Sequence, residues 1–238
     1  MLATHRAAGT WRRYVDAHIV PTAFLLEKLV EAGIPRSRLH VKGNFVDPDP
    51  RVGSGDGHFA LFIGRLAEEK GVGFLLRAWL DAPALPLLIA GDGPLAPSVR
   101  AHANADSLRW LGRQTRHEIA ELLHRATCLV IPSMWYEGQP NVILEAFAAG
   151  VPVIASALGG MASTVEHGVN GLLVPPGDEM ALRAAVAAIA GDPTLAARLR
   201  VGARAAFEKY YAAEANGRRL EEIYAAARSA LSQRLKQS

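Results

Sequence analysis

The chain has 238 residues, of which 50% are hydrophobic and 21% charged, so it has enough apolar mass for one large or two small domains. Its formal net charge of +3 is mild and, even with a pI near 9.2, specifies neither nucleic acid nor a membrane as a partner. The single cysteine, Cys128, excludes an internal disulfide and fits a reducing compartment.

Targeting signals are not evident. No apolar run approaches the roughly 18–20 residues that span a bilayer, and the start, MLATHRAAGTWRRYVD, has no continuous apolar core of the kind found in signal peptides. We therefore predict a cytoplasmic location, with peripheral contact at the inner face of the membrane left open. The basic–aromatic cluster WRRY (11–14) is interpreted as a solvated helix face, and no nucleic-acid partner is expected.

The first 50 residues predict a small β-α-β unit. Its parts are the apolar run 15–20, the helical stretch 22–33 and the run 39–44, and a linker rich in Pro, Gly and Asp follows. Two strands and a helix cannot bury both faces of a sheet. Residues 1–50 are therefore expected to be the remnant of an N-terminal domain with its linker. Asp47-Pro48-Asp49 has the spacing of a DxD metal motif, but proline in a linker favours a turn.

From residue 58 onward, short apolar runs alternate with helical patterns. Strands are predicted at 58–63, 85–94, 107–112, 128–133, 152–156 and 171–176, and helices at 71–81, 94–105, 115–126, 142–149, 161–167 and 178–190. This alternation predicts an α/β fold, a Rossmann-like parallel sheet with crossover helices, over residues 51–210. Ligands of such sheets bind at the carboxyl ends of the strands.

The last segment, 194–236, is helical with a break near Tyr210–Glu214, and residues 211–238 are expected to form a closing helix. A docking stripe is predicted from apolar positions at helical spacing, with a membrane-surface helix as the alternative. These positions are Leu220, Ile223, Tyr224 and Leu231.

Two loops could hold anions. Arg65 follows the first strand of the sheet and Lys70 opens the next helix, so the two cations can converge on one diphosphate, although solvated charges beside Glu68 and Glu69 would give the same pattern. Gly91-Asp92-Gly93 follows the second strand. A dinucleotide fingerprint needs a further glycine where Ala96 stands, so this loop predicts only proximity to a nucleotide.

The stretch EGQPNVILEAFAAG (137–150) places one carboxylate before a helix and another one turn into it. Asn141 is the expected N-cap and Gly150 the residue after the helix end. The helix N-terminus suits phosphate, and Glu137 and Glu145 could accept hydrogen bonds from sugar hydroxyls on either side. Taken alone, the pattern is better explained by a glutamate that interacts with the helix dipole and a loop glutamate that faces water.

Together these pieces resemble the donor-binding half of family-4 glycosyltransferases of the GT-B fold. The matching stretches are FIGRLAEEKGV (62–72), IAGDGP (89–94), WLG (110–112), IPSMWYEGQPNVILEAFAAGVPVIAS (131–156), GG (159–160) and HGVNGLLVPPGD (167–178). They run in order over about 130 residues. The stretches around 19–50 and 207–224 also resemble the segments that flank the donor domain in these enzymes.

The resemblance implies roles for individual residues. Arg65 and Lys70 would neutralise the donor's diphosphate, Glu137 would bind the transferred sugar, and Glu145 would bind the ribose. Arg65, Lys70 and Glu137 are the implied catalytic residues, and the sugar would be transferred with retention and without a metal ion or other cofactor. The remaining implied donor-binding residues are Gly64, Gly91, Gly93, Leu111, Gly112, Arg113, Ser133, Gly138, Gln139, Pro140, Asn141, Val142 and Ile143, of which 111–113 would meet the base.

Two departures limit the transfer of roles. Ser163 stands where the family commonly has a glutamate, and the acceptor-binding N-terminal domain with its catalytic histidine is almost absent; His5 is interpreted as a surface residue. The prediction is a glycosyltransferase moving a hexose from a nucleoside diphosphate sugar to a glycan or lipid-linked acceptor in polysaccharide biosynthesis. The alternatives are a non-catalytic nucleotide-sugar-binding module, or one subunit of a split enzyme with a separate N-terminal-half chain. A GT-B epimerase or phosphorylase is a third interpretation.

Overall fold

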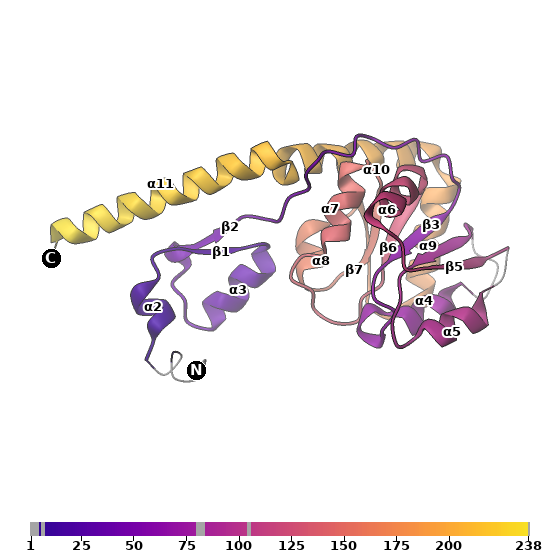
Figure 1. The fold of residues 1–238 in the computed structure, drawn as a ribbon, viewed down its shortest axis with the longest axis horizontal. Coiled ribbons are helices and arrows are strands. Elements are labelled where there is room, and N and C mark those ends of the chain that lie inside the picture. The colour runs from indigo at the N-terminus through magenta and orange to yellow at the C-terminus, as the bar shows by residue number, and fades with distance from the viewer. Residues whose placement is uncertain (1–4, 6–7, 80–83, 104–105, 238) are drawn as a thin grey trace.

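The computed structural model describes residues 5, 8–79, 84–103 and 106–237 (Figure 1). The final residues of the helices predicted at 71–81 and 94–105 lie outside the described residues. Figure 1 shows a sheet domain, a smaller N-terminal unit beside it, and a long C-terminal helix that extends past that unit.

The central sheet confirms the predicted parallel architecture. Its six strands are β3 (Ala60–Ile63), β4 (Leu87–Ala90), β5 (Leu108–Gly112), β6 (Cys128–Ile131), β7 (Val153–Ser156) and β8 (Gly171–Val174). They lie in the order β5-β4-β3-β6-β7-β8, and every neighbouring pair is parallel. The chain builds outward from β3 to β5, then returns to the centre with β6 and builds in the other direction. The switch point between β3 and β6 is where doubly wound sheets bind ligands.

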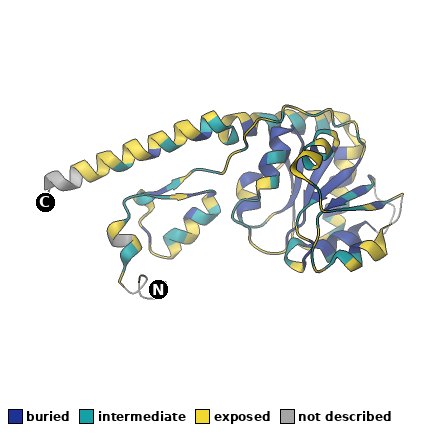
Figure 2. Cartoon of the chain, viewed as in Figure 1, coloured by how far each residue is buried: buried dark blue, intermediate teal, exposed yellow. Residues whose placement is uncertain are grey.

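Helices cover both faces of this sheet. Side chains of α4 (Val72–Ala78), α5 (Ala96–His102) and α9 (Glu179–Gly191) pack on one face, and those of α6 (Arg116–Arg125), α7 (Asn141–Ala148) and α8 (Gly159–Thr164) pack on the other. Alternation along the strands divides the core, because Phe62 and Val130 belong to the first layer and Leu61 and Leu129 to the second. Figure 2 shows this buried interior between more exposed helix surfaces.

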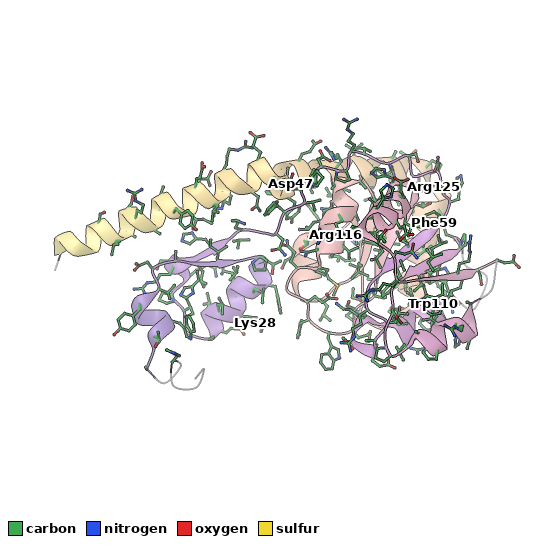
Figure 3. The ribbon with its side chains drawn as sticks, viewed as in Figure 1. Lys28, Asp47, Phe59, Trp110, Arg116 and Arg125 are labelled. Carbon is green, nitrogen blue, oxygen red and sulfur yellow. The ribbon has the colours of Figure 1, made fainter. Side chains whose placement is uncertain are left out.

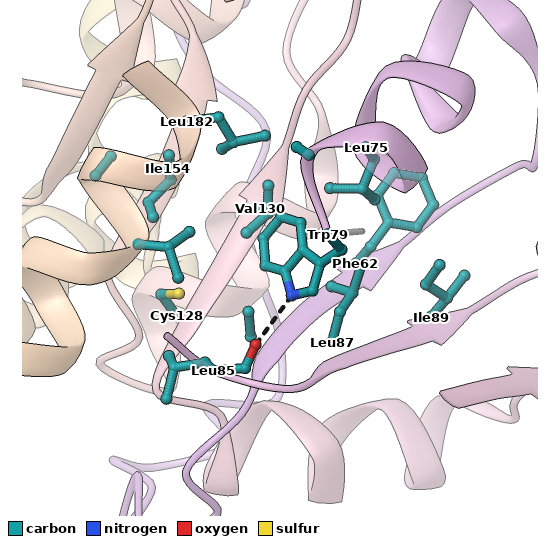
Figure 4. Close-up of a cluster of buried hydrophobic side chains, with 14 of the residues drawn as sticks. Phe62, Leu75, Trp79, Leu85, Leu87, Ile89, Cys128, Val130, Ile154 and Leu182 are labelled. Carbon is teal, nitrogen blue, oxygen red and sulfur yellow. Dashed lines mark hydrogen bonds between the residues drawn. The ribbon is translucent and has the colours of Figure 1, made fainter. Parts of the chain in front are cut away.

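Figure 4 shows the first of these layers in detail. The indole Nε1–H of Trp79 donates to the carbonyl of Leu85 at 2.9 Å, so the polar atom of the buried ring is satisfied. Cys128 is fully buried in the same cluster, and burial raises the pKa of its thiol to about 12. Because only the thiolate is a strong nucleophile, we expect this buried thiol to be inert.

The N-terminal unit confirms the predicted β-α-β arrangement. After α2 (Thr10–Tyr14), strands β1 (His18–Val20) and β2 (Leu39–Val41) pair in parallel, joined by α3 (Ala23–Glu31) and a 3-10 turn, η1 (Arg36–Arg38). Its core is small, formed by Val20, Leu26, Ile34 and Leu39. Ile19 and Val41 are 42% and 37% exposed, so part of the two-stranded sheet is uncovered within the described chain. The proposed domain limits at residues 50 and 210 stay predictions.

The C-terminal helices break where predicted. Helix α10 (Pro193–Ala206) runs into a π-turn, η3 (Phe207–Tyr211), and α11 (Ala213–Gln237) follows. Ile223 is buried, but Tyr224 and Leu231 are 60% and 42% exposed, so the docking stripe is wrong for these two positions. The reason is that α11 projects away from the sheet domain beyond its first turns (Figure 1). Among the described residues no single helix could cross a membrane by length and composition; α9 with α10 and η3 qualifies only as a pair bent by 99°.

The linker before the sheet is fastened to α10. Arg204 donates to both carboxylate oxygens of Asp49 at 2.8 and 2.6 Å, and to the carbonyl of Ala148 at 2.7 Å. The hydrogen bonds from Arg204 hold the pKa of Asp49 below its usual range. Asp49 therefore serves in a structural ion pair, which agrees with the interpretation of Asp47-Pro48-Asp49 as a turn.

Candidate active site

The loops after β3 and β6 lie against each other at the switch point. The 3-10 turn η2 (Glu68–Lys70) leads into Gly71, which has φ 72°, and a Cβ added there would stand 2.0 Å from the carbonyl oxygen of Pro132. The backbone N–H of Met134 donates to the carbonyl of Glu69 at 3.0 Å. The fold therefore brings Lys70 next to Glu137 although 66 residues separate them in sequence.

A three-residue polar network forms where these loops meet. Lys70 Nζ lies 2.6 Å from Glu137 Oε2, and the two side chains are 32% and 17% exposed. The buried hydroxyl of Ser133 donates to the other carboxylate oxygen, Oε1. Both oxygens of Glu137 are thus held, which fixes its rotamer, while the Lys70 ammonium keeps further N–H donors for a second acceptor.

A pocket of about 730 Å³ lies at the carboxyl ends of β3, β4 and β5, and the loop after β3 that lines it continues to Lys70. Five predicted donor-binding residues line it: Gly64, Arg65, Gly91, Gly93 and Arg113. The Arg65 side chain is 65% exposed, and its contact with Glu69 Oε1 is long, at 3.8 Å. This ion pair is therefore weak, and the guanidinium can bind an anion instead. The other lining residues were not assigned to the site from the sequence. Ile63, Ala90, Asp92 and Gln114 lie at or just after β3, β4 or β5, so the carboxyl-end rule could have found them, whereas Ile119 lies within α6.

The glycines of the pocket are required by close backbone packing. Gly91 has φ 149°, and an added Cβ would stand 1.9 Å from the carbonyl oxygen of Gly64. The N–H of Gly91 donates to the carbonyl of Gly112 at 2.8 Å, and Gln114 Nε2 donates to that of Leu111 at 2.7 Å. The loops after β3, β4 and β5 are thereby fixed together, and they leave a surface with few side chains.

The segment entering α7 differs from the prediction. Asn141 was expected to be the N-cap, but it is the first helical residue after an extended Pro140, and no side chain caps the helix. Its Oδ1 instead accepts from Asn44 Nδ2 at 2.8 Å, because the linker passes close by, and Gln139 Oε1 accepts from the Asn44 N–H at 2.8 Å. Gly150 has φ 68° after the helix end, as predicted.

Further along α7, two predicted donor-binding residues point into the protein. Ile143 is fully buried and its N–H donates to the carbonyl of Pro140 at 3.1 Å, while Val142 packs against the second core layer. Gly138 accepts from Thr22 Oγ1 at 3.1 Å through its carbonyl oxygen. These contacts leave backbone groups of the loop, rather than core side chains, for contact with a ligand.

Glu145 lies half-buried one turn into α7. Burial raises the pKa of its carboxyl, and the nearby charge of Arg116 on α6 partly opposes that shift (Figure 3). Ser163, where a glutamate was expected from the resemblance, accepts a hydrogen bond from the N–H of Phe24 at 3.2 Å. No group of three or more potential metal ligands occurs within the described part of the chain, and the metal-independent mechanism stays a prediction.

Replacing Glu145 with glutamine is expected to stabilise the fold at alkaline pH. A carboxyl whose folded-state pKa is raised stabilises the protein in its protonated form below the unfolded pKa, and loses that contribution as pH rises through the folded value. Glu145→Gln should therefore raise the melting temperature at pH 8 and leave it unchanged near pH 4, where the wild-type carboxyl is already largely protonated. Thermal melts at both pH values test this.

The exposed Glu121→Gln on α6 is the matched control and should show no such pH dependence. A melting temperature for Glu145→Gln that is lower than wild type at pH 8 would show that the carboxylate stabilises the fold instead.

Similar architectures occur among solved glycosyltransferases of the GT-B fold. The Anabaena protein Alr3699/HepE, in complex with UDP and glucose, superposes with a TM-score of 0.79 at 20% identity, covering 94% of this chain and 67% of that one. Sucrose-phosphate synthase from Thermosynechococcus elongatus gives 0.79 at 25% identity, covering 96% of this chain and 62% of that one. The fold is therefore a parallel α/β sheet domain of the kind found in GT-B glycosyltransferases.

The sequence places the chain in a family. Residues 57–192 match the family model of glycosyl transferases group 1, and the chain belongs to that family. It is 37% identical over 163 residues to a glycogen synthase of Mycobacterium tuberculosis, and 29% identical over 216 residues to an alpha-D-kanosaminyltransferase of Streptomyces kanamyceticus. These alignments cover 65% and 82% of this chain, but only 38% and 56% of the two relatives.

Proposed function

We propose that this chain binds a nucleoside diphosphate sugar and forms the donor half of a retaining glycosyltransferase. The observation that carries the proposal is the Ser133–Glu137–Lys70 network between the loops after β3 and β6, since the same loop after β3 also lines a glycine-rich pocket through Gly64 and Arg65. Family membership and the UDP-bound structural neighbours support the same class of ligand.

In this proposal the cationic side chains bind the diphosphate and the carboxylates bind sugar hydroxyls. Arg65 and Lys70 neutralise the diphosphate, which develops negative charge as the glycosidic bond breaks, so that no metal ion is needed. Glu137, oriented by Ser133, accepts hydrogen bonds from hydroxyls of the transferred sugar, and Glu145 accepts from the ribose. The loop over residues 111–113 meets the base. The donor sugar is a hexose.

The acceptor is proposed to be a glycan or a lipid-linked sugar in polysaccharide biosynthesis, reached in the cytoplasm or at the inner face of the membrane. Among the chain's relatives are proteins named exopolysaccharide phosphotransferase and amylovoran biosynthesis glycosyltransferase, which supports this class of pathway. Acceptor binding would need further residues, in a longer chain or in a separate N-terminal half that covers the exposed Ile19 and Val41.

A calorimetric screen tests the donor half directly. UDP-, GDP- and ADP-linked hexoses are titrated into the wild-type chain, and one of them should bind with a dissociation constant that rises at least about tenfold in the triple variant Arg65→Ala/Lys70→Ala/Glu145→Ala, a loss of about 1.4 kcal/mol. Binding of none of these donors, or equal binding by the triple variant, would refute the proposal. Binding without transfer or donor hydrolysis in the presence of an N-terminal half would favour a non-catalytic binding module.

A further inference from the structure

The loop that carries Glu137 exposes three consecutive large side chains. Met134, Trp135 and Tyr136 are 39%, 71% and 67% exposed, although they sit between the buried Ser133 and the largely buried Glu137. Burial of an aromatic ring contributes about 1.5–3 kcal/mol, so leaving two rings in solvent beside a functional carboxylate calls for a ligand.

The loop is held rigidly at both ends. Met134 donates to the carbonyl of Glu69 through its N–H at 3.0 Å, and the carbonyl of Glu137 accepts from the N–H of Gly160 at 2.7 Å. Tyr136 stacks on Phe24 of α3, with ring centroids 5.1 Å apart and planes inclined by 24°. The loop backbone and the Tyr136 ring are therefore held in place, which reduces the entropy lost when a ligand binds.

Distance and charge identify the kind of ligand. Trp135 is two residues from Glu137, so their Cα atoms lie at most about 7 Å apart, within the width of one sugar ring. The loop 132–140 contains no lysine or arginine, and the two lysines near it are each paired with a carboxylate, Lys70 with Glu137 and Lys28 with Glu31, which disfavours an anionic membrane or phospholipid. Flat exposed indole and phenol faces with a polar edge suit the apolar face of a pyranose, whose hydroxyls remain free for Glu137.

We propose that Trp135 and Tyr136, supported by Phe24, form a stacking platform for a pyranose ring of the acceptor, next to the donor sugar. The inference rests on the proposed function, because it takes Glu137 as the group that binds the transferred sugar. It adds an acceptor subsite on the donor half of the enzyme.

The test measures oligosaccharide binding separately from donor binding. Maltohexaose, cellohexaose and mannohexaose are titrated into the wild-type chain loaded with the nucleoside diphosphate of the donor that binds in the screen, with tryptophan fluorescence and calorimetry as readouts. At least one should bind, and Trp135→Ala should weaken it about tenfold or more while leaving the melting temperature unchanged, since the side chain is 71% exposed. Trp11→Ala, which removes another exposed tryptophan from α2, is the matched control and should bind like wild type.

The following outcomes would contradict the proposed stacking platform. Binding by none of the three oligosaccharides, or equal binding by wild type and Trp135→Ala, refutes it even if the donor screen succeeds. Failure of the donor screen itself refutes the proposed function instead, so the two failures are distinguishable. Trp135-dependent sedimentation with phosphatidylglycerol vesicles, without oligosaccharide binding, would assign the aromatic loop to a membrane surface.

Discussion

Replacing Lys70 with methionine is expected to cause the largest loss of function among single substitutions in the donor site. The Lys70 ammonium lies 2.6 Å from Glu137 Oε2, and in the proposed function it also neutralises the diphosphate of the donor. Removing one preorganised group that stabilises developing charge typically costs a factor of about 10²–10³ in turnover. We therefore expect donor hydrolysis or transfer to fall by about that factor, measured as release of nucleoside diphosphate.

A double variant separates two explanations for that loss. Lys70→Met also leaves the Glu137 carboxylate without its ion-pair partner, which is itself unfavourable for a largely buried charge. Lys70→Met/Glu137→Gln removes that unpaired charge. If nucleotide binding returned to the wild-type level in the double variant, Lys70 would serve only to balance Glu137. Lys209→Ala, an exposed lysine against Tyr210, is the control and should match wild type.

The sheet could be predicted because its strands are buried on both faces. Runs such as ALFI (60–63) and CLVI (128–131) are almost entirely apolar, and this pattern occurs mainly in parallel sheets covered by helices. The same reasoning indicated the carboxyl ends of β3 and β6 as the site. The strand order itself depends on which strands pair across the sheet, and local sequence does not determine that.

Contacts between distant segments escaped prediction. Asn141 is a good N-cap by residue type, but Asn44 of the linker donates to its side chain. The two residues are 97 positions apart, so no local sequence pattern indicates this contact. Tyr224 and Leu231 fit an apolar helical stripe but are exposed, because periodicity does not show where the helix leaves the domain that it packs against. In the site, the ion pair between Lys70 and Glu137 arises from loop packing at Gly71, which spacing alone does not reveal.

Gly160→Ala is expected to disrupt the fold and the donor site together. A Cβ at this position would stand 1.8 Å from the carbonyl oxygen of Gly138 and 2.6 Å from that of Glu137. Both are backbone atoms, so the clash cannot be relieved by a side-chain rotation, and α8 must move away from the Glu137 loop. We expect a loss of about 3 kcal/mol or more, seen as a fall in melting temperature of at least about 6 °C.

Gly160→Ala should also weaken donor binding by more than its loss of stability explains. Moving α8 breaks the hydrogen bond from the Gly160 N–H to the Glu137 carbonyl, 2.7 Å long, which fixes the loop between Ser133 and α7. Nucleotide-sugar affinity should therefore fall at temperatures where the variant is still fully folded by circular dichroism. Gly217→Ala on α11, where a Cβ meets nothing within 4 Å, is the matched control and should gain about 0.5–1 kcal/mol. Wild-type affinity in folded Gly160→Ala would mean that the position of the loop does not control donor binding.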